Sequence, residues 1–246
     1  MKPLTSFERY KRLHLWLLIP FVISVLGFFY SYYLKLASAT FHQHIHGISA
    51  TLWYVLVIVQ PYIIIHRKNF IKHRTYGIIG IVLAGIVAGS AFTIIPLNIN
   101  NVAELDPNGF FNPTFAYFAT FYDFILVSMF ILSVVMAILK VKKLEQHVQW
   151  LIASVLFVLS PGLLRLIGVI AIIMNEGDLG GIMMVDLAYP TLVVMLFLFV
   201  FYYYKFGSFR HLSFKLLVLA HLPILFIKWL GDNQVLRSAA EAIFKY

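Results

Sequence analysis

The sequence predicts an all-α integral membrane protein, a single domain over residues 1–246 built as a bundle of seven transmembrane helices. Composition is the first reason. Of the 246 residues, 61% are hydrophobic and 12% are charged, against roughly 25% charged residues in soluble domains. The second reason is that apolar runs of about 20 residues recur, each long enough to cross ~30 Å of hydrocarbon. The expected spans lie near residues 15–33, 47–65, 76–96, 115–139, 148–174, 185–204 and 214–230.

The expected spans carry different local signals. The first follows a basic stretch, as a signal peptide would, but its apolar run exceeds the roughly 7–15 residues of a signal peptide, so it is expected to remain as a helix. The third holds Gly85 and Gly89 at a spacing that favours close helix packing. Residues 97–114 are rich in Asn, Pro and Gly, and are expected to form an external cap. The prolines expected to break helices locally are Pro61, Pro161, Pro190 and Pro223.

The loop charges predict the topology. By the positive-inside rule, basic loops stay in the cytoplasm, and here they alternate with loops that hold mainly acids. The N-terminus is therefore expected to be cytoplasmic and the C-terminus external. The basic clusters are Lys2, Arg9, Lys11 and Arg12; Arg67, Lys68, Lys72 and Arg74; Lys140, Lys142 and Lys143; and Lys205, Arg210 and Lys215. The acids between them are Glu104, Asp106, Glu176 and Asp178.

Charge and cysteine content exclude several partners. The formal net charge of +9 is distributed among loops instead of lying on one folded face, so no nucleic-acid partner is expected. Membrane lipids are the expected surroundings. The absence of cysteine excludes disulfides and thiolate metal sites, and leaves histidine and carboxylate as the strong metal ligands.

A histidine triplet lies at the external mouth of the second span, in the sequence Phe41-His42-Gln43-His44-Ile45-His46. In a helix His42 and His46 lie one turn apart, and in an extended chain alternate residues share a face, so either conformation presents two imidazoles together. Neutral imidazole suits zinc, iron or copper, and Asp186 at the start of span six can add a carboxylate. The sequence thus predicts a divalent metal site. The alternative is a set of solvated interfacial histidines.

A second pair of histidines lies on the cytoplasmic side, where His73 precedes span three and His147 precedes span five. Haem b needs two imidazoles from different helices at matched depth, and these two are the pair that can supply them. The alternative is that both contact lipid headgroups at the starts of their helices.

Two charged residues lie inside apolar segments, Asp123 in span four and Arg165 in span five. Charges in lipid are costly, so they usually face one another or a water-filled cavity and mark a functional site. Counting along the helices places both at one level, about 12–14 Å from the external end at the helical rise. His221 in span seven reaches the same level. We expect these three to form the catalytic or transport floor of a polar funnel open to the outside; the alternative is a buried ion pair that fixes helix register.

Several short motifs occur together: His46-Gly47, Trp53 and Gln60-Pro61, then His73-Arg74 with Gly77, then His147-x-x-Trp150 leading to Arg165. The combination resembles an uncharacterised family of small bacterial polytopic membrane proteins. The resemblance covers roughly residues 46–168 and implies a helical membrane fold in the bacterial cytoplasmic (inner) membrane.

A looser similarity is to transmembrane cytochromes b, which place haem ligand pairs across spans two/four and three/five. Span four of this chain has no histidine. Only His73 and His147 therefore match that pattern.

Three functions follow from these residues. The first is a His-ligated, metal-dependent enzyme or redox protein acting on a lipid or small molecule. The second is a proton-coupled transporter of a small solute. The third is a b-type haem electron carrier.

Overall fold

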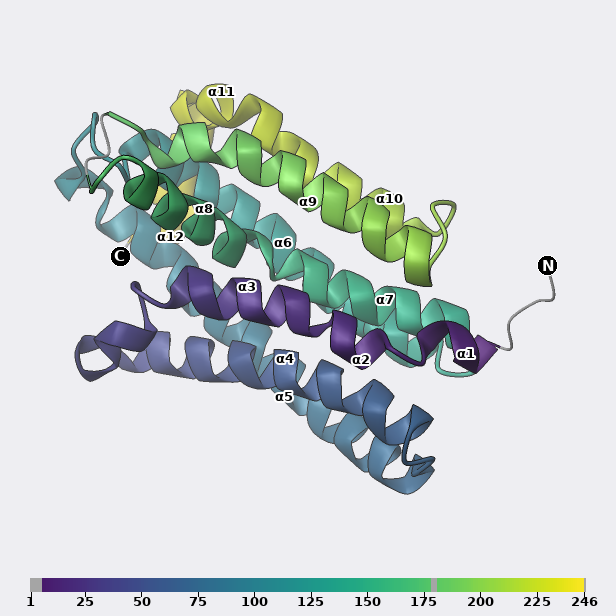
Figure 1. Ribbon diagram of the computed structural model, residues 1–246. Coiled ribbons are helices and arrows are strands. Elements are labelled where there is room, and N and C mark those ends of the chain that lie inside the picture. The colour runs from purple at the N-terminus through teal and green to yellow at the C-terminus, as the bar shows by residue number, and fades with distance from the viewer. Residues whose placement is uncertain (1–5, 178–180, 246) are drawn as a thin grey trace.

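The chain is an all-α bundle, and the part of it that the structure describes contains no β-strand (Figure 1). This computed structural model describes residues 6–177 and 181–245; Lys2 and Asp178 lie outside them. Within those residues six helical segments are long and apolar enough to cross a membrane, and a bent pair of helices makes seven if it counts as one span. The expected fold class is confirmed. Four spans are single helices: α4 (Phe41–Ile65), α5 (Phe70–Asn100), α6 (Pro113–Leu139) and α9 (Met184–Phe206).

Several helix boundaries differ from the sequence prediction. The first span covers Phe7–Phe28, as α1 (Ser6–Tyr10), α2 (Leu13–Trp16) and α3 (Leu18–Phe28), and residues beyond it form the separate short helix η1 (Tyr33–Ser38). α4 begins six residues before the predicted 47, because Thr40 caps it: the Thr40 side chain accepts from the Gln43 backbone N–H and the Gln43 side chain accepts from the Thr40 N–H. Asn69 also caps α5, since its side chain accepts from the Lys72 backbone N–H. Hydropathy detects apolar residues and misses these polar first turns.

The predicted external cap is shorter than expected, since α5 continues to Asn100. A single 3₁₀ turn, η2 (Val102–Glu104), follows. The loop then ends at Asn112, whose side chain accepts from the Phe115 N–H at the start of α6. Its backbone also joins the far part of the bundle, because the Met184 N–H donates to the Phe110 carbonyl.

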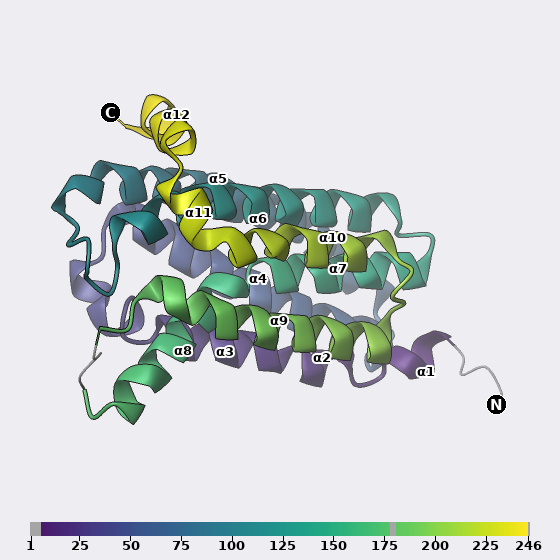
Figure 2. The same ribbon diagram turned by 90° about the horizontal axis from the view of Figure 1, so that it is seen from above.

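The last span is interrupted. It consists of α10 (Leu212–His221), the 3₁₀ segment η3 (Leu222–Phe226) that contains Pro223, and α11 (Ile227–Asp232). The C-terminal α12 (Gln234–Phe244) projects from the side of the bundle, where it contacts α5, α6 and α11 (Figure 2). Pro61 and Pro190, by contrast, lie inside α4 and α9.

The fifth span is the bent pair. α7 (Leu144–Phe157) and α8 (Ser160–Met174) meet at 44°. Pro161 lies in the first turn of α8, where proline fits because the N–H that it lacks has no partner inside the helix. The break thus lies where the sequence favours the start of a new helix, and it directs α8 toward α3.

Glycine permits a close backbone contact between α3 and α8. A Cβ atom built on Gly27 of α3 would lie 1.9 Å from the carbonyl oxygen of Gly162 of α8, so any side chain there would force the helices apart. Gly85 and Gly89 do not have this role: a Cβ on either would meet nothing within 4 Å. The prediction of close packing at Gly85 and Gly89 is wrong within this chain, since these glycines lie on an exposed face of α5.

The two ends of the bundle carry different charge. The N-terminal helix and the turns at residues 66–69, 140–143 and 207–211 lie at one end, which we call the basic end, and the C-terminus lies at the other, the open end (Figure 1). Arg9 ties the N-terminal helix to this end by donating to the carbonyls of Lys205 (3.0 Å) and Gly207 (2.6 Å), where a cation is favourable at the C-terminus of α9. The distribution agrees with the predicted alternation of basic loops.

Single cysteines should show which side each end faces. The chain has no native cysteine, so Lys72→Cys and Asn108→Cys can each be labelled alone; both residues are exposed and lie near opposite ends of α5. With a membrane-impermeant maleimide on intact cells, we expect Asn108→Cys to react and Lys72→Cys to react only after permeabilisation. Labelling of both from the same side would contradict the topology, and the inverse result would reverse the orientation.

Gly27→Ala should destabilise the bundle, because the new methyl group would meet the Gly162 backbone and overpacking typically costs about 1–3 kcal/mol. Gly85→Ala is the matched control. In open space the same change should be neutral or should stabilise the helix by up to about 1 kcal/mol. Thermal unfolding midpoints in one detergent would compare them; equal midpoints would show that the contact does not constrain the helices.

Candidate functional site

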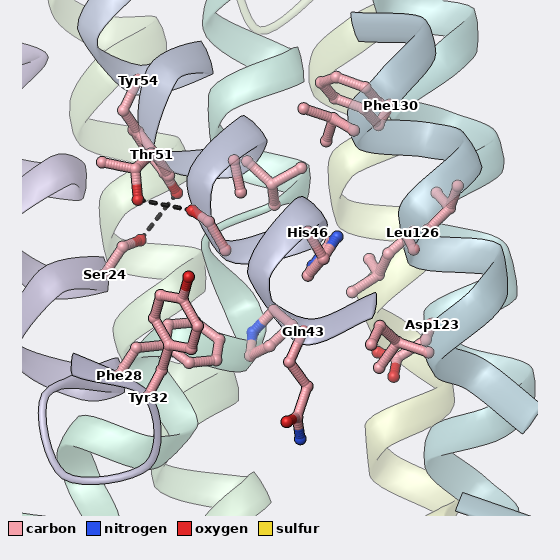
Figure 3. A pocket seen from close by; sticks show the side chains of 18 of the residues that line it. Ser24, Phe28, Tyr32, Gln43, His46, Thr51, Tyr54, Asp123, Leu126 and Phe130 are labelled. Atoms are coloured by element: carbon pink, nitrogen blue, oxygen red, sulfur yellow. Dashed lines mark hydrogen bonds between the residues drawn. The ribbon is translucent and has the colours of Figure 1, made fainter. Parts of the chain in front are cut away.

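A cavity of about 380 Å³ lies inside the bundle (Figure 3). Its walls are α3, α4, α5, α6 and α8, and its inner end is formed by Phe130 and Phe157, which are almost completely buried. Exposed Ser31 and Gln43 line its mouth at the open end of the bundle. Most of the lining is apolar. The volume is at the lower end of the roughly 300–1,000 Å³ typical of small-molecule sites.

Asp123 and Arg165, the two intramembrane charges, both line this cavity and both are half-buried. They attract each other electrostatically, but no ion pair within 4.0 Å joins them among the described residues. The Arg165 guanidinium donates to the Pro161 carbonyl of its own helix (3.0 Å) and lies 4.7 Å from the centre of the Phe28 ring. Within residues 6–177 and 181–245, the Asp123 carboxylate has no hydrogen-bond partner. Direct pairing is therefore absent, and a contact through one water stays a prediction.

A smaller chamber of about 90 Å³ lies on the other side of the two charges, and Asp123 and Arg165 line it as well. The chamber has room for several water molecules. Tyr122 and Ser160 form part of its wall, and their hydroxyl groups are 3.0 Å apart. The charged pair thus lies between the larger cavity and this smaller chamber.

The expectation that His221 borders the cavity is wrong. His221 is completely buried, lines neither chamber, and packs against the rings of Tyr122, Phe157 and Phe199. Its Nδ1 donates to the Leu217 carbonyl (2.8 Å), and its Nε2 is buried without a partner. Counting residues along a helix gave the depth of His221 but not the face of the helix on which it lies.

His46 is the one member of the histidine triplet that lines the cavity. The Ser90 hydroxyl donates to the Val87 carbonyl (3.0 Å), so its oxygen accepts from His46 Nδ1 at 3.1 Å. In the neutral ring the proton then lies on Nδ1, and Nε2 carries the lone pair. His46 therefore brings a hydrogen-bond acceptor to the same cavity as Asp123 and Arg165.

The other predicted metal ligands lie apart. The segment is helical, so His44 lies on the opposite face from His42 and His46; His44 Nδ1 is 3.4 Å from the Tyr32 hydroxyl, and His42 is exposed. Asp186 forms an ion pair with Lys228 at 3.2 Å. Among the described residues no three His, Cys, Asp or Glu side chains are placed to share a metal ion. Metal binding at this mouth stays a prediction.

The structure brings His73 and His147 together at the basic end, with ring centres 6.5 Å apart and planes at 80°. His147 Nδ1 donates to the Ala137 carbonyl (2.8 Å), which leaves Nε2 as a possible ligand atom. His73 Nδ1 and Gln60 Oε1 are buried without partners. Neither histidine lines either of the two chambers, so the imidazoles meet but the space for a haem is not in those cavities. Haem binding stays a prediction.

Other lining residues were not singled out from the sequence. Ser24 donates to the Tyr54 hydroxyl (2.9 Å) on the cavity wall; its position as a polar residue inside an apolar span is a signal that could have found it. Gln43 and Tyr32 line the mouth. Burial, and then the neighbouring Tyr33, raise the pKa of Tyr32, so its hydroxyl remains a donor near neutral pH.

Comparisons of this chain with protein-family models, curated proteins and solved structures find no match. The site and the fold define the class: a multi-pass helical membrane protein with a charged internal cavity. The resemblance to the family of small bacterial membrane proteins stays a prediction.

Asp123→Asn, Arg165→Gln and the double substitution should show whether the two charges support each other. A charge left alone in the membrane costs on the order of 3 kcal/mol on insertion scales, and removing both partners leaves no uncompensated charge. We therefore expect the double variant to be more stable than the sum of the single losses predicts, by about 1 kcal/mol. Unfolding in detergent would measure it; additive losses would show that the charges act independently.

Proposed function

We propose that this protein binds a small amphipathic solute in the cavity and carries it across the membrane, with a proton-linked step at Asp123. One observation carries the proposal: the cavity holds both intramembrane charges, opens at one end of the bundle, and ends at Phe130 and Phe157. Charged residues that face a cavity inside a membrane protein commonly mark a solute or proton pathway.

The bend between α7 and α8 supports transport. Phe157 and Val158 at the break, and Pro161 and Arg165 just beyond it, all line the cavity. Secondary transporters commonly build their sites from interrupted helices near the middle of the membrane. A change in the bend would alter the cavity directly, because the cavity wall itself contains the break.

Asp123 is suited to couple a proton to the solute. Its carboxyl group faces the cavity and has no hydrogen-bond partner in the described chain, so a proton and a solute donor group compete for the same oxygen atoms. Arg165 attracts the ionised carboxylate across the cavity and also attracts any acceptor of the solute. Binding of the solute and of the proton are then thermodynamically linked.

Transport has more support than the two other functions. The metal-dependent enzyme or redox protein requires histidines and Asp186 to converge, and among the described residues they lie apart. The haem electron carrier requires a cofactor space at His73 and His147, and neither residue borders the two chambers.

The proposed setting is the bacterial cytoplasmic membrane, surrounded by lipid, with the basic end inside and the cavity open to the outside. The positive-inside rule supports this orientation. A site open outward would take up its solute from the external medium.

Ala50→Cys should report alternating access. Ala50 lines the cavity, whereas Val82, the matched control, lies exposed on the outer face of α5. A charged, water-soluble methanethiosulfonate should modify Ala50→Cys from the outside and leave Val82→Cys unmodified in lipid. In inside-out vesicles Ala50→Cys should also react, more slowly, since a carrier exposes its site to each side in turn. Reaction from one side under all conditions would contradict carriage.

A further inference from the structure

We infer that the solute is zwitterionic: a small molecule with a cationic donor group and an anionic acceptor group close together on an apolar body. The inference rests on the proposed function, because it concerns the same cavity. It begins from the hydrogen-bonding capacity that Asp123 and Arg165 leave unused.

The Asp123 carboxylate accepts only, and none of its acceptor positions is used by the described residues. The Arg165 guanidinium has five N–H donors, and one of its hydrogen bonds goes to a protein group, the Pro161 carbonyl. A polar group in an apolar site requires compensating hydrogen bonds. The two residues therefore offer complementary, unfilled positions.

The two charges line the same cavity. No ion pair within 4.0 Å joins them, so their charged atoms lie farther apart than that. A ligand with a single charge would satisfy one group and leave the other without a partner. An ammonium at Asp123 and a carboxylate or phosphate at Arg165 would satisfy both and keep the net charge of the site unchanged.

His46 and the apolar wall complete the recognition. The lone pair of His46 Nε2 is a second acceptor for an ammonium group, given the hydrogen bond of Nδ1 to Ser90. Beyond the charges the lining is apolar, with Leu126, Phe130 and Val87 among its residues. An aliphatic or aromatic body fits there, and a volume of about 380 Å³ limits it to a small molecule or the head region of a lipid.

Three probes with similar chains test this in lipid nanodiscs: 2-aminooctanoate, octanoate and octylammonium. Charge-assisted hydrogen bonds are worth about 1.5–3 kcal/mol each. We therefore expect 2-aminooctanoate to bind at least about tenfold more tightly than either single-charge probe. Calorimetry with subtraction of empty nanodiscs would measure it. The comparison uses the unmodified protein, so it does not depend on whether a variant folds.

Substitutions identify which residue binds each charged group of the probe. Asp123→Asn should abolish the preference for 2-aminooctanoate over octanoate, and Arg165→Gln should abolish its preference over octylammonium. Ala50→Trp, which fills the cavity, should remove binding of every probe, and Val82→Trp on the lipid face should change none. Dihexanoyl phosphatidylethanolamine, a short-chain lipid, distinguishes a lipid headgroup from a free amino acid. Tighter binding of this lipid than of 2-aminooctanoate would identify a lipid headgroup as the solute, and the reverse would identify a free amino acid; either result supports the zwitterion.

A failure of the zwitterion inference and a failure of the proposed cavity site would give different results. Equal binding of the three probes, removed by Ala50→Trp, would overturn the zwitterion and leave the cavity site intact. Absence of binding, or binding that Ala50→Trp leaves unchanged, would overturn both the zwitterion and the proposed site.

Discussion

The contact between α3 and α8 is the constraint on which the cavity depends. Gly27 and Gly162 bring the two backbones together. Phe28, the next residue of α3, meets Arg165, three residues after Gly162 in α8, with the guanidinium over the ring. That stacking directs the arginine toward the cavity. The same approach exists only because α8 leaves the line of α7 at the break before Ser160. A straight fifth span would not present Arg165 to this wall.

The membrane sets a second constraint, because the charges of Asp123 and Arg165 need compensation inside it. A charge in hydrocarbon requires either an opposite charge or water. Asp123 and Arg165 attract one another without touching, and both border two chambers. Pairing them directly would use part of their hydrogen-bonding capacity and weaken the attraction of either group for a ligand. In the proposed function, the gap between them costs stability but leaves both groups able to bind a solute.

Much of the fold followed from the sequence because hydropathy and loop charge report directly on membrane crossing. The apolar runs located every span, and the isolated charges located the level of the site. Two kinds of information were missing. Hydropathy does not register polar caps, so it missed the turns that begin at Thr40 and Asn69. Depth along a helix does not give direction around it, so His221 was expected in the cavity but lies behind Tyr122.

Partners far along the chain were also invisible in the sequence. Asp186 was expected beside the histidines, but it pairs with Lys228 on α11, a contact that depends on how the interrupted last span returns to the open end. Gly85 and Gly89 had the spacing of a packing motif, yet Gly27 and Gly162 make the close contact. Spacing shows which residues are able to pack closely, and the paths of the helices decide which of them do.

The glycine contact has a mechanical consequence. With no side chain between them, the backbones of α3 and α8 are in direct contact, and the break between α7 and α8 lies just before Ser160. In the proposed transport function, a change of the bend at this break would move Arg165 relative to Asp123, which lies on α6 in the same cavity wall. A solute bound between the two charges would then hold them at a fixed separation and oppose that change.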